Sequence, residues 1–234
     1  MLVLAHRGNT GRALRENTLE AFEAALADCA DGLETDVCVT ADGEAVLFHD
    51  LRLQDGTPVR ALSQAELSRR VGHPVPTLAE ALAAWPEAFW DVELKTADVA
   101  EPAVRELRAR KLERLVVTSF LHDLVDRLAA ETALPCGYLL AHRPSARERA
   151  ALLAAPGDRA PRKVVCDLDV LDDRLAHSVR SSGHELGVYN VLTSDEAARC
   201  AAWGASLLVS DRPREVRGSR AARRPDPGRR RRSS

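Results

Sequence analysis

Short apolar runs rich in β-branched residues alternate with amphipathic helical segments along most of this chain of 234 residues. Strands that alternate with helices pair in parallel, because each helix carries the chain back across the sheet. Eight such units favour a closed (β/α)8 TIM barrel over an open, doubly wound sheet. The eight expected strands comprise residues 2–5, 33–39, 89–94, 115–119, 136–140, 164–168, 186–191 and 207–210.

Helix start signals lie between these runs. In the pattern of a capping box, a residue that caps a helix precedes a glutamate by three positions. The pattern occurs at Asn17, Thr77, Ser145 and Thr193. Amphipathic periodicity predicts further helices over residues 101–112, 122–131 and 172–182.

One connection is too short for a parallel crossover. Only four residues separate the second expected strand from an apolar run at residues 44–48, so these two strands form an antiparallel hairpin. Asp42-Gly43 is a strong signal for its turn. A two-residue loop there pairs Asp36 with His49, and a loop shifted back by one residue pairs Glu34 with His49. Either register places His49 beside both carboxylates.

The rest of the chain divides into an insertion, a barrel domain and a tail. Residues 51–76 contain few apolar residues and three prolines, so we expect a polar insertion or lid near the barrel mouth. The barrel domain is expected to comprise residues 1–213. Residues 214–234 are rich in Arg, Pro, Gly and Ser and are predicted to form a disordered tail, because this composition cannot bury a core.

The charge of the chain is unevenly distributed. The formal net charge is −2, but the tail carries +7, which leaves −9 on residues 1–213. An acidic body argues against a nucleic-acid-binding surface on the folded part. It also means that a site for a phosphate would need local positive charge.

The cysteines and the apolar runs indicate the compartment. Five widely spaced cysteines form no Cys-x-x-Cys pair, so they predict neither a disulfide framework nor a zinc site. No apolar run is long enough to span a membrane, and residues 1–5 are too short for the apolar core of a signal peptide. We therefore expect a cytoplasmic protein.

In three of the expected strands, charged side chains follow the apolar residues with which the strand begins. In a parallel barrel, residues at the carboxyl ends of the strands meet around its mouth. Glu34 and Asp36 point to one face because strand side chains alternate, and Glu93 comes from another strand of the barrel. Carboxylates that converge in this way suit Mg²⁺ or Ca²⁺, which prefer oxygen ligands. The sequence therefore predicts a divalent-cation site formed by Glu34, Asp36 and Glu93.

Two histidines and two cationic residues belong to the same end of the barrel. His6 and His49 have no cysteine partners, which suits proton transfer better than zinc binding. Arg7 offers a phosphate a planar fork of donors, and Lys95 offers a point charge. Each residue alone has an ordinary structural explanation, such as an ion pair or a solvated strand face. Their coincidence at one end of several strands favours metal-assisted phosphoryl chemistry.

Eight motifs occur in a fixed order along residues 1–213. They are His6-Arg7-Gly8, Glu16-Asn17-Thr18 with Phe22, Glu34-x-Asp36, Thr40-x-Asp42-Gly43, His49-Asp50, Pro76-Thr77-Leu78-x-Glu80, Glu93-x-Lys95 and Ser119-Phe120. Together these motifs resemble the glycerophosphodiester phosphodiesterase family. The resemblance implies a (β/α)8 barrel that hydrolyses small-molecule glycerophosphodiesters to glycerol 3-phosphate and an alcohol.

The resemblance also implies a role for each site residue. Three acidic residues are implied as ligands of a divalent metal, Mg²⁺ or Ca²⁺: Glu34, Asp36 and Glu93. Two histidines are implied as the general acid and base, His6 and His49, with the direction of proton transfer open. Two cationic residues are implied as phosphate contacts, Arg7 and Lys95. Asn17 is expected to act as a helix cap rather than as a substrate contact.

The main departure from the family pattern lies at the seventh strand. Family members often carry Trp-Thr-x-Asn there, and the matching stretch is Tyr189-Asn190-Val191-Leu192. Tyr189 still offers the substrate a ring and a hydroxyl, whereas Leu192 cannot form a hydrogen bond. The departure bears on the glycerol-side contacts and on the choice of substrate, not on the metal or the histidines.

Two other functions are compatible with the sequence. One is a phospholipase D-like phosphodiesterase that acts on lysophospholipid or sphingolipid head groups, which predicts an apolar patch around the mouth. The other is a binding module that the basic tail attaches to nucleic acid or to an anionic membrane. The acidic body and the polar composition of residues 51–76 favour the glycerophosphodiesterase, which requires no nucleic acid and no transmembrane segment.

Overall fold

The structure is a computed structural model that describes residues 1–9, 14–110, 112–154 and 162–218. Eight parallel strands close into a barrel, because the first strand pairs with both the second and the last. The barrel strands are β1 (Leu2–His6), β2 (Gly32–Val39), β4 (Phe89–Leu94), β5 (Leu115–Ser119), β6 (Cys136–Leu140), β7 (Lys163–Asp167), β8 (Glu185–Tyr189) and β9 (Leu207–Ser210). The predicted (β/α)8 TIM barrel is therefore confirmed.

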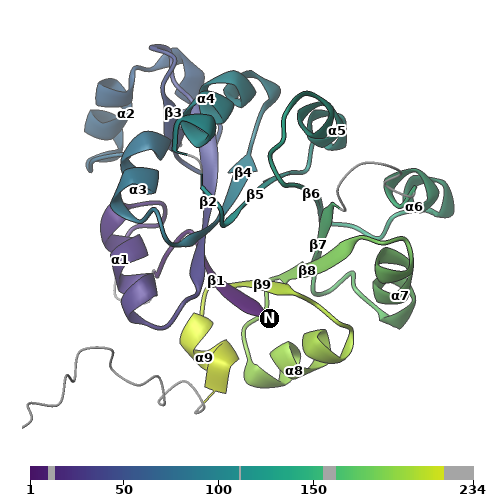
Figure 1. Cartoon of the computed structure of the whole chain (residues 1–234). Helices are drawn as coiled ribbons and strands as arrows, with labels where there is room; N and C mark the ends of the chain where they lie inside the picture. Colours follow the sequence, from purple (N-terminus) through teal and green to yellow (C-terminus); the bar gives the residue numbers. More distant parts are fainter. Residues whose placement is uncertain (10–13, 111, 155–161, 219–234) are drawn as a thin grey trace, which may run out of the picture.

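Helices surround the barrel on its outer side (Figure 1). Those that the sequence predicted are α1 (Leu19–Ala27), α3 (Leu78–Ala84), α4 (Ala100–Arg110), α5 (His122–Glu131), α6 (Ala146–Leu152), α7 (Asp173–Ser181) and α8 (Ser194–Ala202). Two further helices were not predicted, α2 (Gln64–Val71) and α9 (Pro213–Arg217). Two short 3-10 segments, η1 (Val59–Ala61) and η2 (Ala97–Val99), complete the connections.

The main core lies between the barrel and its helices. Trp90 of β4 is fully buried, and its ring meets the ring of Phe22 from α1 edge to face, with centroids 5.5 Å apart. The indole N–H of Trp90 donates to the carbonyl of Trp85 at 3.1 Å. Buried aromatic pairs of this kind contribute large apolar area and a defined geometry. They fix the strands whose carboxyl ends carry the charged residues.

The hairpin forms, but both predicted registers are wrong. β3 (Ala45–Leu47) pairs antiparallel with β2, and Val37 lies opposite Leu47. Asp36 therefore lies opposite Phe48 rather than His49, and the Phe48 N–H donates to the Asp36 carbonyl at 3.1 Å. The pairing is shifted by one residue relative to each expectation.

The physical reason is a loop of three residues. The Thr40 N–H donates to the Glu44 carbonyl at 3.1 Å, and the Gly43 N–H donates to the Thr40 carbonyl at 3.0 Å. Gly43 has a φ of 79°, in the left-handed region that glycine adopts without strain. A hairpin turn that ends in a left-handed glycine is one residue longer than the two-residue loop assumed from Asp42-Gly43.

Residues 51–76 form more structure than the polar insertion that the sequence predicted. Ser63 begins α2 with a complete capping box, and Gly72 ends it in the left-handed conformation. Leu67 of this helix is fully buried. The segment has a small apolar core against β2 and β3, formed by Cys38, Val46, Val59, Leu62, Leu67 and Val75.

The expected boundary at residue 213 coincides with the start of α9. Val216 of this helix is 4% exposed, so it packs on the barrel domain. Arg214 and Arg217 pair with Asp28 and Asp31. Residues 214–217 thus belong to the folded part rather than to the tail, whereas residues 219–234 lie outside the described residues. None of the described helices is long and apolar enough to cross a membrane.

Candidate active site

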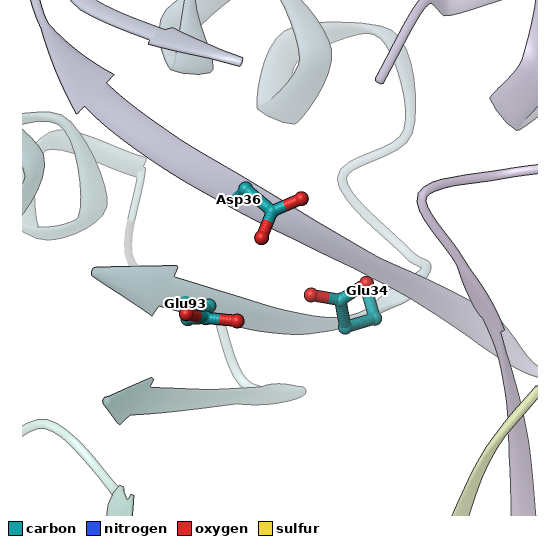
Figure 2. A group of neighbouring side chains, drawn as sticks. All are labelled: Glu34, Asp36 and Glu93. Carbon is teal, nitrogen blue, oxygen red and sulfur yellow. The ribbon is translucent and has the colours of Figure 1, made fainter. Parts of the chain in front are cut away.

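The three carboxylates predicted to bind a cation lie together on the neighbouring strands β2 and β4, with Glu93 near the carboxyl end of β4 (Figure 2). Asp36 pairs with Glu93 in the parallel register, and Glu34 lies two residues earlier on the same face. Each of the three residues places a carboxylate oxygen within 4.8 Å of the other two. All three residues are buried, and Asp36 completely so.

Two cationic side chains lie against these carboxylates. Arg7 Nε is 2.9 Å from Asp36 Oδ2, without the alignment of a hydrogen bond, and the Arg7 backbone N–H donates to Glu34 Oε2 at 3.1 Å. Lys95 Nζ is 3.2 Å from Asp36 Oδ1 and 2.9 Å from Glu93 Oε1. Three buried carboxylates thus share the positive charges of Arg7 and Lys95.

Burial and charge move the pKa values of these carboxyls in opposite directions. Burial by itself would raise the pKa of Asp36, but the positive charges of Arg7 and Lys95 outweigh it and lower that pKa. Burial and the negative charge of Asp36 raise the pKa of Glu34 well above its usual range. They also raise the pKa of Glu93, although Lys95 opposes the shift. The cluster is therefore short of positive charge.

His6 is held by a residue that the sequence analysis did not identify. Its Nδ1 lies 2.7 Å from Asp211 Oδ1, and its Nε2 lies 3.9 Å from Glu34 Oε2. The hydrogen bond from His6 lowers the pKa of Asp211. A carboxylate on Nδ1 fixes the orientation of the ring and leaves Nε2 for proton exchange.

His49 is also held by an aspartate, but its partner is the next residue in the chain. Its Nδ1 lies 2.9 Å from Oδ1 of the adjacent Asp50. His49 borders the same cavity as His6 and Glu34. The inference that the hairpin brings His49 to the carboxylates is therefore confirmed, although the predicted register is wrong.

Asn17 is not the predicted helix cap. Thr18 caps α1, because its side chain accepts a hydrogen bond from the Ala21 N–H at 3.3 Å. The Asn17 amide instead donates to Asp36 Oδ2 at 2.9 Å and accepts from Thr35 Oγ1 at 2.7 Å. Asn17 is 2% exposed and has a φ of 56°, which is unfavourable for a residue with a side chain. It holds the Asp36 carboxylate in place.

A cavity of about 260 Å³ opens at this end of the barrel. Seven of the eight predicted site residues line it: His6, Arg7, Glu34, His49, Glu93, Lys95 and Tyr189. The eighth, Asp36, lies behind Arg7 and Lys95. The structure thus brings all the predicted site residues together.

Two aromatic side chains, Phe120 and Tyr189, also line the cavity. The rings of Phe120 and Tyr189 meet edge to face with centroids 6.4 Å apart. The Tyr189 hydroxyl donates to the Leu140 carbonyl at 3.1 Å, so it offers a substrate its ring and an acceptor oxygen rather than a donor. Asn190 also borders the cavity, and its amide donates to Asp167 at 2.8 Å.

Two carboxylates at the site were missed from the sequence, although both carried a signal, and Asn17 was assigned the wrong role. Asp211 directly follows the apolar strand β9, as Arg7 follows β1 and Lys95 follows β4. Asp91 alternates with Glu93 along β4 and therefore shares its face. The contact of Asn17 with Asp36 carried no such signal, because only the tertiary fold brings these two residues together.

The donor set of the cluster fits a hard divalent cation. Its three ligands offer carboxylate oxygens alone, which suits Mg²⁺ or Ca²⁺ rather than zinc. Buried carboxylates without matching positive charge are unfavourable. The raised pKa of Glu34 reports this mismatch, and a bound divalent cation would remove it.

Comparison with known proteins links this geometry to a family. The chain matches the model of the glycerophosphoryl diester phosphodiesterase family over residues 6–215. It is 33% identical over 129 residues to the probable glycerophosphodiester phosphodiesterase 2 of Mycobacterium tuberculosis, covering 51% of this chain and 48% of that protein. It is 32% identical over 206 residues to the glycerophosphodiester phosphodiesterase 1 of Mus musculus, covering 75% of this chain and 60% of that protein. The chain spans about half the length of the curated relatives it matches.

Solved structures share the fold over nearly the whole chain. The glycerophosphodiester phosphodiesterase of Thermotoga maritima superposes with a TM-score of 0.78 at 22% identity, covering 92% of this chain and 96% of that one. A phosphodiesterase of Oleispira antarctica, solved with the product sn-glycerol-3-phosphate, has a TM-score of 0.78 at 23% identity and covers 95% and 96%. At these identities the likeness establishes the barrel fold.

Proposed function

The chain belongs to the glycerophosphoryl diester phosphodiesterase family, and from this premise we propose that it hydrolyses glycerophosphodiesters to sn-glycerol 3-phosphate and an alcohol. One observation carries the proposal: two histidines, each held by an aspartate, border the same cavity as Glu34 and Glu93, and these two carboxylates cluster with the buried carboxylate of Asp36. The product sn-glycerol-3-phosphate in the Oleispira antarctica phosphodiesterase supports the same substrate class.

Glu34, Asp36 and Glu93 would hold a divalent cation, Mg²⁺ or Ca²⁺. When bound, such an ion draws negative charge from the phosphate oxygens and favours attack at phosphorus. Two neighbouring residues hold ligands of the cation in position. Asn17 holds Asp36, and the backbone of Arg7 holds Glu34.

Arg7 and Lys95 bind the phosphate beside this ion. Lys95 has three N–H donors, and its contacts with Asp36 and Glu93 use two of them. The third is available to a phosphate oxygen. Arg7 has five donors in a planar fork and borders the same cavity. Fixed donors of this kind stabilise the charge that develops in the transition state.

His6 and His49 exchange protons with the reacting oxygens. One imidazole accepts the proton of the attacking hydroxyl, which belongs to water or to the 2-position of the substrate glycerol. In the second case the product is a cyclic phosphate, and a water molecule then opens the ring to give glycerol 3-phosphate. The other donates a proton to the leaving alcohol. Asp211 and Asp50 orient both rings through Nδ1, so that each Nε2 is free to act.

The direct test is the release of glycerol 3-phosphate from glycerophosphocholine and glycerophosphoethanolamine. We expect turnover with Mg²⁺ or Ca²⁺, loss of turnover after chelation, and recovery when the ion is restored. Full activity in excess chelator would exclude the metal role. Lack of activity on every glycerophosphodiester, with either ion present, would exclude the substrate class.

A second candidate is hydrolysis of lysophospholipid, and one observation favours it. In the described part of the chain, four large apolar side chains are exposed, and two of them directly follow barrel strand β5 at its carboxyl end: Phe120 and Leu121. Such a rim can contact an acyl chain. Parallel assays with lysophosphatidylcholine and glycerophosphocholine separate the two candidates. Much faster turnover of the lipid would favour the second.

We also propose a cytoplasmic location. All five cysteines lie among the described residues, and none of them is in a disulfide. Free thiols are typical of reducing compartments. Cell fractionation tests the location, and recovery of the protein outside the cytosolic fraction would exclude it.

A further inference from the structure

Asp91 is a fourth carboxylate beside the proposed cation site. Its backbone pairs with Glu34 across β2 and β4. This pair lies two residues before the pair formed by Asp36 and Glu93, in the direction of the strand starts. Because strand side chains alternate, Asp91 and Glu93 point to the same side, and Asp91 borders the same cavity. Asp91 is 1% exposed. The four side chains form two layers, with Glu34 and Asp91 in the deeper one.

The surroundings of Asp91 do not balance its charge. The Thr118 hydroxyl donates to one carboxylate oxygen at 2.6 Å. No hydrogen bond joins the other oxygen to any residue in the described part of the chain. Lys163 of β7 attracts Asp91 from a distance, but its ammonium is paired with Glu185.

The need for a hydrogen-bond acceptor does not explain an aspartate here. An asparagine has the same shape, and its carbonyl oxygen could accept the Thr118 hydroxyl equally well. It would do so without placing a buried carboxylate near Glu93, where like charges repel. The carboxylate is unfavourable in the protein alone, so a ligand that it stabilises would explain its presence.

We propose that Asp91 completes the cation site as a fourth carboxylate, by holding a water molecule bound to the ion. This inference rests on the cation site of the proposed function. Asp91 does not belong to the group whose ligand atoms all lie within 4.8 Å of one another, so it acts through water rather than as a direct ligand. Divalent cations such as Mg²⁺ usually keep several waters in protein sites. Asp91 is thus a positioning residue.

The test compares the wild type with Asp91→Asn and with Asp195→Asn. Asp195 is exposed in the first turn of α8, so its replacement removes the same charge at a solvated position. Binding of Mg²⁺ and Ca²⁺ to each chelator-treated full-length chain is measured by titration calorimetry. We expect Asp91→Asn to weaken binding by about tenfold or more, as loss of an outer-shell partner does. Asp195→Asn should bind as the wild type does.

Thermal unfolding gives a second readout. At a saturating concentration of the ion, a tenfold weaker affinity removes about 1.4 kcal/mol of cation-induced stabilisation. Without the ion, we expect Asp91→Asn to unfold at or above the temperature of the wild type, because the variant lacks an uncompensated buried carboxylate.

Each outcome decides the inference. Unchanged cation affinity in Asp91→Asn would overturn it while leaving the proposed function intact. Failure of Asp91→Asn to fold without the ion would also overturn it, because the carboxylate would then support the fold itself. If the wild type bound neither ion, this inference and the cation site of the proposed function would fall together.

Discussion

His6 and Asp211 are 205 residues apart in the chain, yet their side chains meet at 2.7 Å. The closure of the barrel causes this contact. β1 and β9 pair in parallel so that Ala5 lies opposite Ser210, and the next residue of each strand is His6 or Asp211. The strand that closes the barrel therefore supplies the partner of an imidazole at its mouth.

Asp211→Asn is expected to lower kcat for glycerophosphocholine by roughly 10- to 100-fold. This is less than the full contribution of a positioned acid or base, because the His6 ring remains but is less well oriented. The amide keeps the shape of the side chain but cannot hold His6 by a charged hydrogen bond. Steady-state kinetics at saturating cation should show a smaller change in KM. Asp195→Asn serves as the control, and an unchanged kcat in Asp211→Asn would show that the contact is not used.

Lys95→Met should separate cation binding from phosphate binding. Lys95 repels a cation and attracts a phosphate, so its removal should strengthen Mg²⁺ binding by about tenfold. It should also reduce kcat by about 100-fold or more, because a donor to the transition state is lost. Calorimetry and kinetics measure the two effects, and Lys95→Arg retains the charge as a control. If Lys95→Met lowered both the Mg²⁺ affinity and kcat, Lys95 would serve only to order Asp36 and Glu93.

Asn17 should be tested with a pair of variants. Asn17→Gly removes the hydrogen bonds to Asp36 and Thr35 but tolerates the positive φ, and we expect a loss of about 1–3 kcal/mol in the free energy of unfolding. Asn17→Ala adds the backbone strain of the left-handed region, about 1 kcal/mol more. Urea denaturation measures both values. If the alanine variant were as stable as the glycine variant, the strain argument would be wrong.

Two truncations should show where the folded part ends. Deletion of residues 219–234 should leave the unfolding temperature and the turnover of soluble diester unchanged. Deletion of residues 214–234 also removes Val216 and the pairing of Arg217 with Asp31. Loss of one buried valine alone is worth about 1.5–3 kcal/mol. Equal stability of the two truncated chains would contradict the packing of α9. If the chain without residues 219–234 lost turnover, these residues would contribute to catalysis or to substrate binding.

The cysteines offer a test of burial. Burial raises the pKa of the Cys166 thiol to about 12 and that of Cys200 to about 11, and both residues are fully buried. Because the thiolate is the reactive form, we expect both to resist Ellman's reagent at mildly alkaline pH. Cys29 is partly exposed and should react. Denaturant should expose all five thiols, and Cys29→Ser should abolish the reaction of the folded protein. Reaction of further thiols in the native state would indicate a looser core.

Features of this protein that depend on local pattern could be predicted from the residue order alone. The alternation of strands and helices indicated the barrel, and the period of two along a strand put Glu34 with Asp36 on one face. Charged residues that follow the apolar residues of a strand indicated the mouth of the barrel, because parallel strands end together there. These inferences needed only the residue order within single strands.

Features that depend on barrel closure and on packing could not be predicted before the fold was known. The three-residue loop at Gly43 set the register of the hairpin, and burial of Leu67 and Val216 made folded structure from segments that look polar. Barrel closure joined His6 to Asp211, and the packing of α1 on β2 brought Asn17 to Asp36. Such contacts form between residues distant in the chain, where no local periodicity reports which side chains will meet.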